Sequence, residues 1–307
     1  MINSFYFHFP FSCNFCCPWC VTSSVSDVIK FDARKSVSYI KKVLSLGYKE
    51  IRFSGGEPLL YNKEFQYILD NILQPDITYT VNTNGSLLYK NFEMFNKRKP
   101  RIIWISVNTL NEVLYNRLTK TKLTIKHLIR TIQKMLIFNI NIGINILMTN
   151  LNINEIPDII STLLSKNIRE YKLLDLTHLG RGYGISTLNI KSVDMDILFK
   201  KIQEKFAGFP IRIRADVARL KKYNTPVCIL PTRSFLTLSS DGKLYQCYQM
   251  AFNKSQKYIL QDMYKNNKIN QVKLKLVKGK IKPYERPPCL FLNDSTKRCP
   301  IYLERIV

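Results

Sequence analysis

Cysteine carries the clearest chemical signal in this 307-residue chain, and its eight copies fall into two groups. Four lie close together near the amino terminus and four are spread over the last third: Cys13, Cys16, Cys17 and Cys20, then Cys228, Cys247, Cys289 and Cys299. Intracellular thiols are kept reduced, so closely spaced cysteines favour metal ligation over disulfides. We therefore expect two metal sites, one from each group.

The first group has a spacing suited to an iron-sulfur cluster. Three residues separate Cys13 from Cys17, and two separate Cys17 from Cys20. Thiolates are the usual ligands of such clusters, and a four-iron cluster needs four ligands, so three cysteines leave one iron open to a chelating ligand. Cys16 makes the register ambiguous, because Cys13, Cys16 and Cys20 form a second possible set. A structural zinc knuckle is the alternative for the whole loop, although no second Cys-x2-Cys arm lies nearby.

The loop from Cys13 to Cys20 resembles the cluster-binding loop of radical S-adenosylmethionine (SAM) enzymes, both in spacing and in the aromatic Trp19 before the last cysteine. The resemblance implies a [4Fe-4S] cluster on Cys13, Cys17 and Cys20, with the amino and carboxylate groups of SAM on the open iron. Reductive cleavage of SAM would then give a 5'-deoxyadenosyl radical that abstracts hydrogen. Cys16 is left as a loop thiol or as a catalytic thiol that returns a hydrogen atom.

The segment Gly55-Gly56-Glu57-Pro58 stands where a second strand is expected to end. Two glycines let a backbone approach a ligand without interference from side chains, and a glutamate can accept a hydrogen bond from an ammonium group. Alone, the segment is an ordinary strand-to-helix turn. After the cysteine loop, it resembles the segment of radical SAM enzymes that binds the methionine amine of SAM.

Polar residues at the ends of later strands are weaker candidates. Their positions resemble those that contact SAM or shape the site in the same family, although ordinary turn residues are the alternative. An arginine after the sixth strand could pair with a carboxylate or a phosphate. These candidates are Thr83, Asn84, Ser106, Asn108, Asn145 and Arg181.

The later cysteines resemble an auxiliary-cluster extension. Thirteen residues separate Cys228 from Gly242, and four separate Gly242 from Cys247, which resembles the opening of the SPASM extension or its shorter twitch form. The full SPASM pattern has more cysteines, so the resemblance implies one auxiliary [4Fe-4S] cluster, on Cys228, Cys247, Cys289 and Cys299. Four buried cysteines or a single zinc site are the alternatives.

Strand-like and helix-like segments alternate over the first two thirds, which predicts repeated βα units and a parallel sheet. We expect strands at Asn3–Phe9, Glu50–Ser54, Ile77–Asn82, Arg101–Val107, Ile140–Leu147 and Glu170–Thr177. We expect helices at Asp32–Leu46, Asn62–Leu73, Leu87–Phe95, Thr124–Phe138, Ile153–Ser165 and Ser192–Phe206. Six units are fewer than the eight of a full barrel, which needs about 250 residues, so the predicted fold is a partial (βα)6 TIM-like barrel.

A small C-terminal α+β extension should follow, because the rhythm changes after Gly208 and Pro210. Ser234–Ser239 and Lys243–Cys247, joined by the turn Ser240-Asp241-Gly242, predict a β-hairpin. We therefore divide the chain into a radical SAM barrel over residues 1–208 and a SPASM/twitch-like domain over residues 209–307.

Composition indicates where the protein is located and which partners it could bind. The chain has no apolar run of 18 residues and no signal peptide at its start, so we expect a cytoplasmic protein without a membrane partner. The net charge of +25 suits an acidic leader peptide and also raises nucleic acid as a partner, although the lysines are spread over most predicted helices.

The expected function is therefore a radical SAM oxidoreductase acting on a ribosomally synthesised peptide, which it would crosslink, epimerise or oxidise. An electron donor such as flavodoxin or ferredoxin would reduce it. Modification of a small metabolite, or of tRNA or rRNA, is the alternative within the same chemistry. A non-catalytic, metal-dependent nucleic-acid-binding protein is the alternative outside it.

Overall fold

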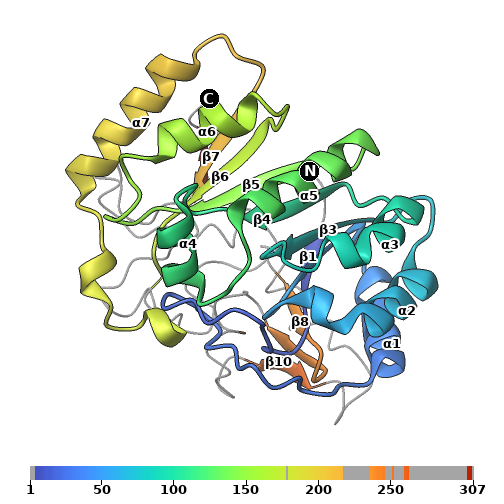
Figure 1. Cartoon of the computed structure of the whole chain (residues 1–307). Coiled ribbons are helices and arrows are strands. Elements are labelled where there is room, and N and C mark those ends of the chain that lie inside the picture. Colours follow the sequence, from blue (N-terminus) through green and yellow to red (C-terminus); the bar gives the residue numbers. More distant parts are fainter. Residues whose placement is uncertain are drawn as a thin grey trace, which may run out of the picture.

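The computed structural model describes residues 4–177, 179–216, 236–245, 251, 259–262 and 303–305, which form one sheet with helices packed on it (Figure 1). The strands follow the order β10-β9-β8-β1-β2-β3-β4-β5-β6-β7-β11. Neighbours from β1 to β7 pair in parallel. Their bounds are β1 (Ser4–His8), β2 (Glu50–Ser54), β3 (Thr78–Thr83), β4 (Ile102–Ser106), β5 (Ile142–Leu147), β6 (Glu170–Leu174) and β7 (Arg212–Asp216).

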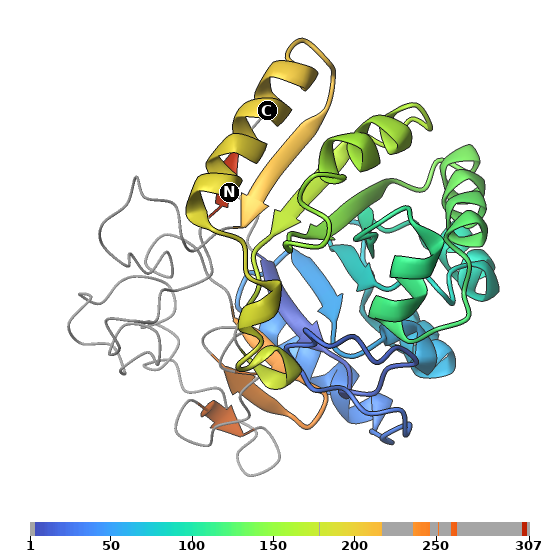
Figure 2. The ribbon, with the colours of Figure 1, turned by 60° about the vertical axis from the view of Figure 1, so that its left-hand side comes forward.

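Helices follow the strands in turn and lie on the outer side of the curved sheet (Figures 1 and 2). They are α1 (Ala33–Leu44), α2 (Asn62–Ile72), α3 (Phe92–Lys97), α4 (Glu112–Thr119), α5 (Ile125–Ile137), α6 (Ile156–Leu164) and α7 (Ser192–Phe206). Asp32, Asn111 and Thr124 accept a hydrogen bond from the third backbone N–H of α1, α4 and α5, as N-cap residues do. The predicted α/β partial barrel is confirmed.

Two elements of the barrel were not predicted. Helix α4 has only eight residues and begins at Glu112, after a short loop that follows the end of β4 at Ser106. Strand β7 pairs with β6 in parallel, whereas the sequence predicts that the repeating units end at Gly208 and Pro210. Its sequence Arg-Ile-Arg-Ala-Asp alternates charged and apolar residues, the pattern of a strand with one apolar face.

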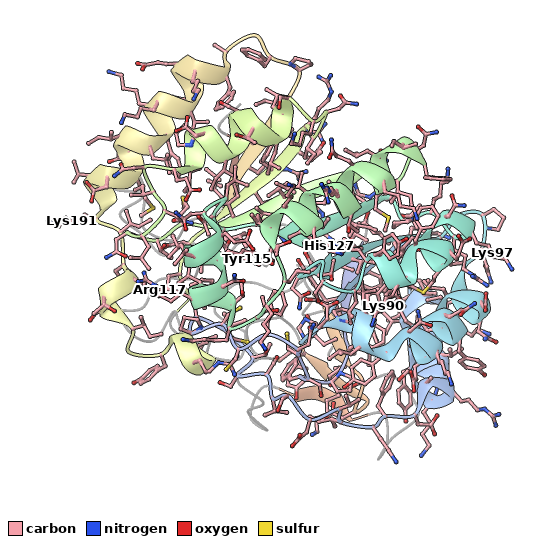
Figure 3. All side chains as sticks on the ribbon, viewed as in Figure 1. Lys90, Lys97, Tyr115, Arg117, His127 and Lys191 are labelled. Carbon is pink, nitrogen blue, oxygen red and sulfur yellow. The ribbon has the colours of Figure 1, made fainter. Side chains whose placement is uncertain are left out.

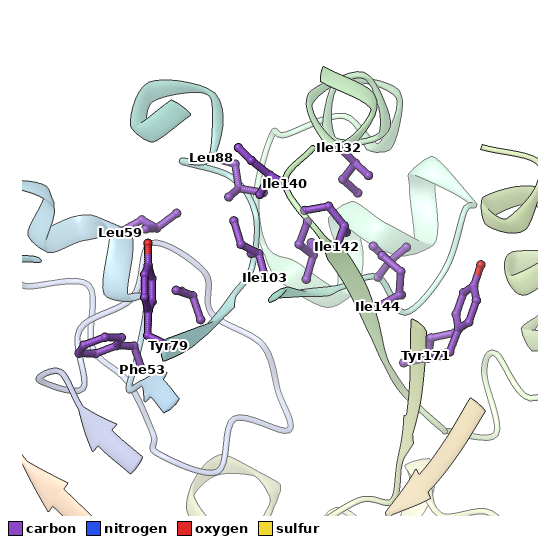
Figure 4. Packing of buried hydrophobic residues seen from close by; sticks show 14 of the residues in the cluster. Phe53, Leu59, Tyr79, Leu88, Ile103, Ile132, Ile140, Ile142, Ile144 and Tyr171 are labelled. Atoms are coloured by element: carbon purple, nitrogen blue, oxygen red, sulfur yellow. The ribbon is translucent and has the colours of Figure 1, made fainter. Parts of the chain in front are cut away.

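Alternation along the strands separates the two faces of the sheet. Residues on the outer face are aromatic or branched and fully buried under the helices, and Figure 4 shows part of this core, including Phe53, Tyr79, Ile103, Ile144 and Tyr171. Burial of such side chains typically contributes about 1.5–3 kcal/mol each. The helices therefore pack against the outer face, and most of the polar residues of the strands lie on the inner face.

Ion pairs cross the inner face near the amino ends of the strands. The Glu50 carboxylate has no exposed surface and pairs with Arg52, at 3.0 Å from its Nε, and with Arg101. Glu170 of β6 pairs in the same way with Arg212 and Arg214 of β7, at 3.0 and 3.2 Å. Both sets lie at the opposite end of the strands from the cysteine loop.

Strands from the C-terminal part extend the sheet at both edges. The hairpin of β8 (Thr237–Ser239) and β9 (Lys243–Tyr245) was predicted, and β8 pairs in parallel with β1. β10 (Ile259–Asp262) pairs with β9, and β11 (Leu303–Arg305) pairs with β7. The division of the chain near residue 208 stays a prediction.

Charge is dispersed over the described surface. Figure 3 shows Lys90, Lys97, Arg117 and Lys191 in separate places along the ribbon, and all four are exposed. Among the described residues, none of the helices combines the length and the apolar character that crossing a membrane requires.

Candidate active site

A cavity of about 360 Å³ lies where the carboxyl ends of the parallel strands meet. Ligands of α/β barrels bind at this end, and the volume is within the range of sites for small molecules. Most of the predicted residues line it: Cys13, Cys17, Trp19, Cys20, Gly55, Gly56, Thr83, Asn84, Ser106, Asn108 and Asn145. Glu57, Pro58, Arg181 and Cys16 are not part of this lining.

The cysteine loop follows β1 and is held by backbone hydrogen bonds. The backbone of Cys13 donates to Val25 (2.8 Å), and Val25 donates to Phe11 (3.0 Å), which ties the two ends of the loop together. The Cys16 thiol is exposed, whereas those of Cys13, Cys17 and Cys20 are partly buried and face the cavity. Cys16 therefore lies outside the cavity that the other three cysteines line.

The electrostatic environment of the three thiols is uneven. Burial raises the pKa of Cys13 to about 11 and that of Cys17 to about 12, and the neighbouring thiols add to both shifts. Burial also raises the pKa of Cys20, but hydrogen bonds from Thr22 and Ser24 outweigh it and leave that pKa below its usual value. The three thiols thus share one cavity but differ in how strongly their surroundings favour the thiolate form.

Gly55 and Gly56 pack against the chain that leads into the cysteine loop. A Cβ on Gly55 would lie 2.6 Å from the carbonyl oxygen of Phe9, and one on Gly56 would lie 2.0 Å from that of Ser12. Real Cβ atoms do not approach this closely, so only glycine fits at either position. The backbone N–H of Glu57 then donates to the Ser12 carbonyl at 2.7 Å. The glycines therefore position the residue directly before Cys13, besides lining the cavity.

The Glu57 side chain turns away from the cavity. Its Oε1 accepts from Thr83 Oγ1 (2.7 Å) and from the backbone of Leu59 (3.0 Å), and its Oε2 accepts from the backbone of Asn84 (2.8 Å). Burial raises the pKa of this carboxyl to about 7, although the three hydrogen bonds act in the opposite direction. The structure thus places the carboxylate as a link between the β2 and β3 loops. Pro58 is buried at the start of the following 3-10 turn.

Asn84 continues this link to the cysteines. Its Nδ2 donates to Asn14 Oδ1 at 3.0 Å and lies 3.7 Å from the Cys13 sulfur. Its Oδ1 accepts from the backbone and hydroxyl of Ser86 at 2.9 and 2.6 Å. Asn84 therefore contacts both a candidate ligand and the cavity.

Residues from β4 and β5 complete the opposite wall. Asn108 Oδ1 accepts from the backbone of Leu147 at 2.8 Å, which joins the ends of these two strands. Asn145 Nδ2 lies 3.4 Å from Asn82 Oδ1, and Asn145 Oδ1 is buried without a hydrogen-bond partner among the described residues. Ser106 is exposed at the same edge. Asn145 therefore offers an acceptor to a polar ligand.

Arg181 was expected to pair with an anionic group, but in the structure it binds the backbone of the cysteine loop. Its Nε donates to the Cys17 carbonyl (3.0 Å) and its Nη1 to the Ser24 carbonyl (2.6 Å). Its backbone N–H donates to the Cys20 carbonyl at 2.9 Å. Arg181 therefore lies behind the loop.

Several lining residues were missed in the sequence. Most alternate with buried apolar residues inside the strands, or follow shortly after them: Tyr6, Asn82, Lys172, Asp175 and Thr177. This alternation is itself a signal, since strands of a parallel sheet covered on both faces are expected to be apolar throughout. The inward position of Lys172, whose Nζ lies 3.6 Å from the centre of the Trp104 ring, could have been inferred in this way.

The residues at this site fit an iron-sulfur cluster. In the described part of the chain, no three His, Cys, Asp or Glu side chains converge on a point that could hold one metal ion. Thiolate ligands of a cluster bind different iron atoms, so they surround a volume rather than a point. Three thiols that face one cavity satisfy this requirement. Cys228, Cys247, Cys289 and Cys299 lie outside the described residues.

Fold and site define a partial-barrel enzyme with a cysteine loop at the carboxyl ends of its strands, and the family model agrees. The Radical SAM superfamily model matches residues 8–163, about half of the chain. The chain belongs to the radical SAM superfamily and is a radical SAM enzyme. Membership implies SAM and a [4Fe-4S] cluster as its cofactors.

Similar proteins include the GTP 3',8-cyclase of Clostridium perfringens, which is 28% identical over 176 residues. That match covers 55% of this chain and 54% of the relative, so the chain spans about half the length of this relative. The GTP 3',8-cyclase of Staphylococcus aureus is 22% identical over 263 residues, covering 76% of this chain and 75% of the relative.

Two solved structures share the fold. Streptococcus suis SuiB bound to its precursor peptide SuiA has a TM-score of 0.71 at 15% identity, covering 85% of this chain and 63% of SuiB. Native anSMEcpe with bound AdoMet has a TM-score of 0.68 at 17% identity, covering 91% and 82%. At these identities the likeness concerns the fold alone.

Proposed function

We propose that this enzyme cleaves SAM reductively at a cluster held by Cys13, Cys17 and Cys20, and modifies a ribosomally synthesised peptide. One observation carries the cluster assignment: these three thiols face one cavity, and Cys16 does not. This arrangement favours the register that leaves Cys16 outside the ligand set. When bound, the reduced cluster supplies the electron that cleaves SAM to a 5'-deoxyadenosyl radical, which abstracts hydrogen from the substrate.

The residues around the cavity would orient the cofactor. Gly55 and Gly56 expose backbone at the wall and so suit the methionine end of SAM. The buried Asn145 Oδ1 suits a donor group of the ligand, since a buried acceptor without a partner is costly. Thr83 and Asn84 would shape the same wall, with Glu57 holding them from behind. Trp19, Ser106 and Asn108 complete the proposed SAM-binding surface.

Two features support a peptide as the substrate. The net charge of +25 would attract an acidic leader peptide, because long-range electrostatic attraction accelerates association. SuiB, which shares the fold, was crystallised with a precursor peptide. Small metabolites are the second candidate class, favoured by the names of the GTP 3',8-cyclase relatives.

The cluster assignment is tested by SAM cleavage. Protein reconstituted anaerobically with iron and sulfide, then mixed with SAM and dithionite, should form 5'-deoxyadenosine. Joint replacement of Cys13, Cys17 and Cys20 by Ala should abolish the product, whereas Cys16→Ala, the matched control, should retain it. Product formation by the triple variant would contradict the assignment.

The substrate is tested by comparing three additions under the same conditions: short peptides encoded beside the gene, GTP, and bulk tRNA. A SAM-dependent mass change in a peptide supports the proposal. Conversion of GTP, or a change in tRNA nucleosides, would instead assign the other substrate classes.

We also propose one auxiliary [4Fe-4S] cluster on Cys228, Cys247, Cys289 and Cys299. A four-iron cluster bound by four cysteines needs all four of these residues. Replacing Cys228 and Cys247 by Ala should halve the iron content of the reconstituted protein. Unchanged iron content would refute the auxiliary cluster and leave the amino-terminal one unaffected.

A further inference from the structure

Arg181 joins the two ends of the segment that carries the last candidate ligand. Its Nε donates to the Cys17 carbonyl at 3.0 Å, and its Nη1 donates to the Ser24 carbonyl at 2.6 Å. Cys20 lies between these two residues, and its own carbonyl accepts from the Arg181 backbone at 2.9 Å. One residue therefore makes three hydrogen bonds to the segment from Cys17 to Ser24.

The turn that presents Arg181 is built to approach this segment closely. A Cβ on Gly180 would lie 2.5 Å from the carbonyl oxygens of both Cys20 and Val21, and Gly180 has a φ of +57°. A Cβ on Gly182 would lie 2.8 Å from the Thr177 carbonyl. A side chain on Gly180 would push the turn and the cysteine loop apart, and one on Gly182 would collide within the turn itself, so glycine suits both positions.

The guanidinium also carries charge into a partly buried place. Arginine stays protonated at any physiological pH, and its planar fork can bridge two acceptors at once. Its Nη2 is buried and has no hydrogen-bond partner among the described residues. The guanidinium lies against the cysteine loop, with its Nε 3.0 Å from the carbonyl oxygen of Cys17. Arg181 therefore favours negative charge at the cysteine loop.

We propose that Arg181 is a positioning residue that fixes the segment from Cys17 to Ser24 and makes the cluster easier to reduce. The inference rests on the proposed binding of a cluster by Cys13, Cys17 and Cys20. Reduction adds one electron, and hence one negative charge, to a group already bound by thiolates. A fixed positive charge beside a ligand stabilises the reduced form more than the oxidised form, because attraction grows with the charge that it acts on.

Redox titration separates this role from a merely structural one. The experiment uses full-length reconstituted protein, dithionite as the reductant, and the EPR signal that changes when SAM is added. Arg181→Gln removes the charge, and Arg181→Lys keeps it without the two-carbonyl bridge. Arg130→Gln, on the exposed side of α5, is the matched control for loss of one positive charge. Iron content and the melting temperature of the iron-free protein are measured for each variant.

At the potential where half of the native cluster is reduced, we expect the ratio of reduced to oxidised cluster to fall about tenfold in Arg181→Gln. For a one-electron couple, this corresponds to a midpoint potential that is lower by about 59 mV. Arg181→Lys should keep the ratio within about threefold of the native value, because its charge remains. Arg130→Gln should leave the ratio unchanged. Lower iron content in both Arg181 variants, with a native melting temperature, would support the positioning part.

A native midpoint together with native iron content in Arg181→Gln would overturn the inference. If Arg181→Gln loads no cluster, Arg181→Lys decides: a native-like midpoint supports the role of the charge, and a strongly lowered midpoint overturns it. A native protein without any SAM-responsive cluster would instead overturn the proposed function, so the two failures are distinguishable.

Discussion

Substituting Gly56 by Ala should displace the cysteine loop without touching a cysteine. The added Cβ would lie 2.0 Å from the Ser12 carbonyl oxygen and 2.6 Å from its carbon, and both are backbone atoms that cannot rotate away. Gly56 does not have a positive φ, so the steric contact is the whole effect. Relieving it requires the chain before Cys13 to move, which breaks the 2.7 Å hydrogen bond from Glu57 to Ser12.

The size of this effect follows from two contributions. Overpacking of a dense interior typically costs about 1–3 kcal/mol. Loss of one buried hydrogen bond adds about 1 kcal/mol. The sum of about 2–4 kcal/mol should lower the melting temperature of a chain of this length by roughly 3–6 °C, because the unfolding entropy is about 2.1 cal/mol/K per residue.

Differential scanning calorimetry of the iron-free protein and iron analysis after reconstitution measure both consequences. Gly47→Ala is the matched control: Gly47 has a φ of +91° and no atom within 4 Å of an added Cβ. It should lose about 1 kcal/mol through backbone strain and load iron as the native protein does. A Gly56→Ala protein with native stability and native iron content would refute the packing argument.

Two further predictions concern buried carboxyl groups. Burial raises the pKa of Glu57 from 4.5 to about 7, so the folded protein holds this proton over a range in which the unfolded chain has lost it. The free energy of unfolding should therefore decrease as the pH rises from about 4.5 to 7, by at most about 3 kcal/mol. Urea denaturation across this pH range should show a smaller decrease for Glu57→Gln than for the native protein. Equal slopes would contradict the shift. Glu50→Gln should lower the free energy of unfolding by about 2–3 kcal/mol. This is less than for a fully buried ion pair, because Arg52 and Arg101 are partly exposed. A decrease below about 0.5 kcal/mol in urea denaturation would exclude a stabilising role for the Glu50 charge.

The barrel elements were predictable where local sequence and tertiary structure agree. β2 (Glu50–Ser54) and β6 (Glu170–Leu174) alternate polar residues with branched or aromatic ones. β2 has the predicted bounds, and β6 begins at the predicted residue but ends three residues before Thr177. β7 alternates in the same way, but Gly208 and Pro210 precede it and Ile213 is its one large apolar residue. Its arginines pair with Glu170, which lies on another strand. A pattern within one segment does not contain that partner.

At the candidate site, too, local features were predictable and contacts between distant segments were not. The spacing of Cys13, Cys17 and Cys20 and the pair of glycines are local features, and the structure brings these residues to one cavity. The direction of the Glu57 carboxylate was not predictable, because its acceptors are filled by donors that include Thr83, 26 residues further along the chain. The same holds for Arg181, which reaches a carbonyl 164 residues away.

The most direct test of the central claim is EPR spectroscopy of the dithionite-reduced protein before and after addition of SAM. If three cysteines leave one iron open, SAM binds that iron and the cluster signal must change, in the native protein and equally in Cys16→Ala. The change should be absent from Cys13→Ala. A reduced cluster whose signal SAM leaves unaltered, or a colourless protein that contains stoichiometric zinc, would contradict the account.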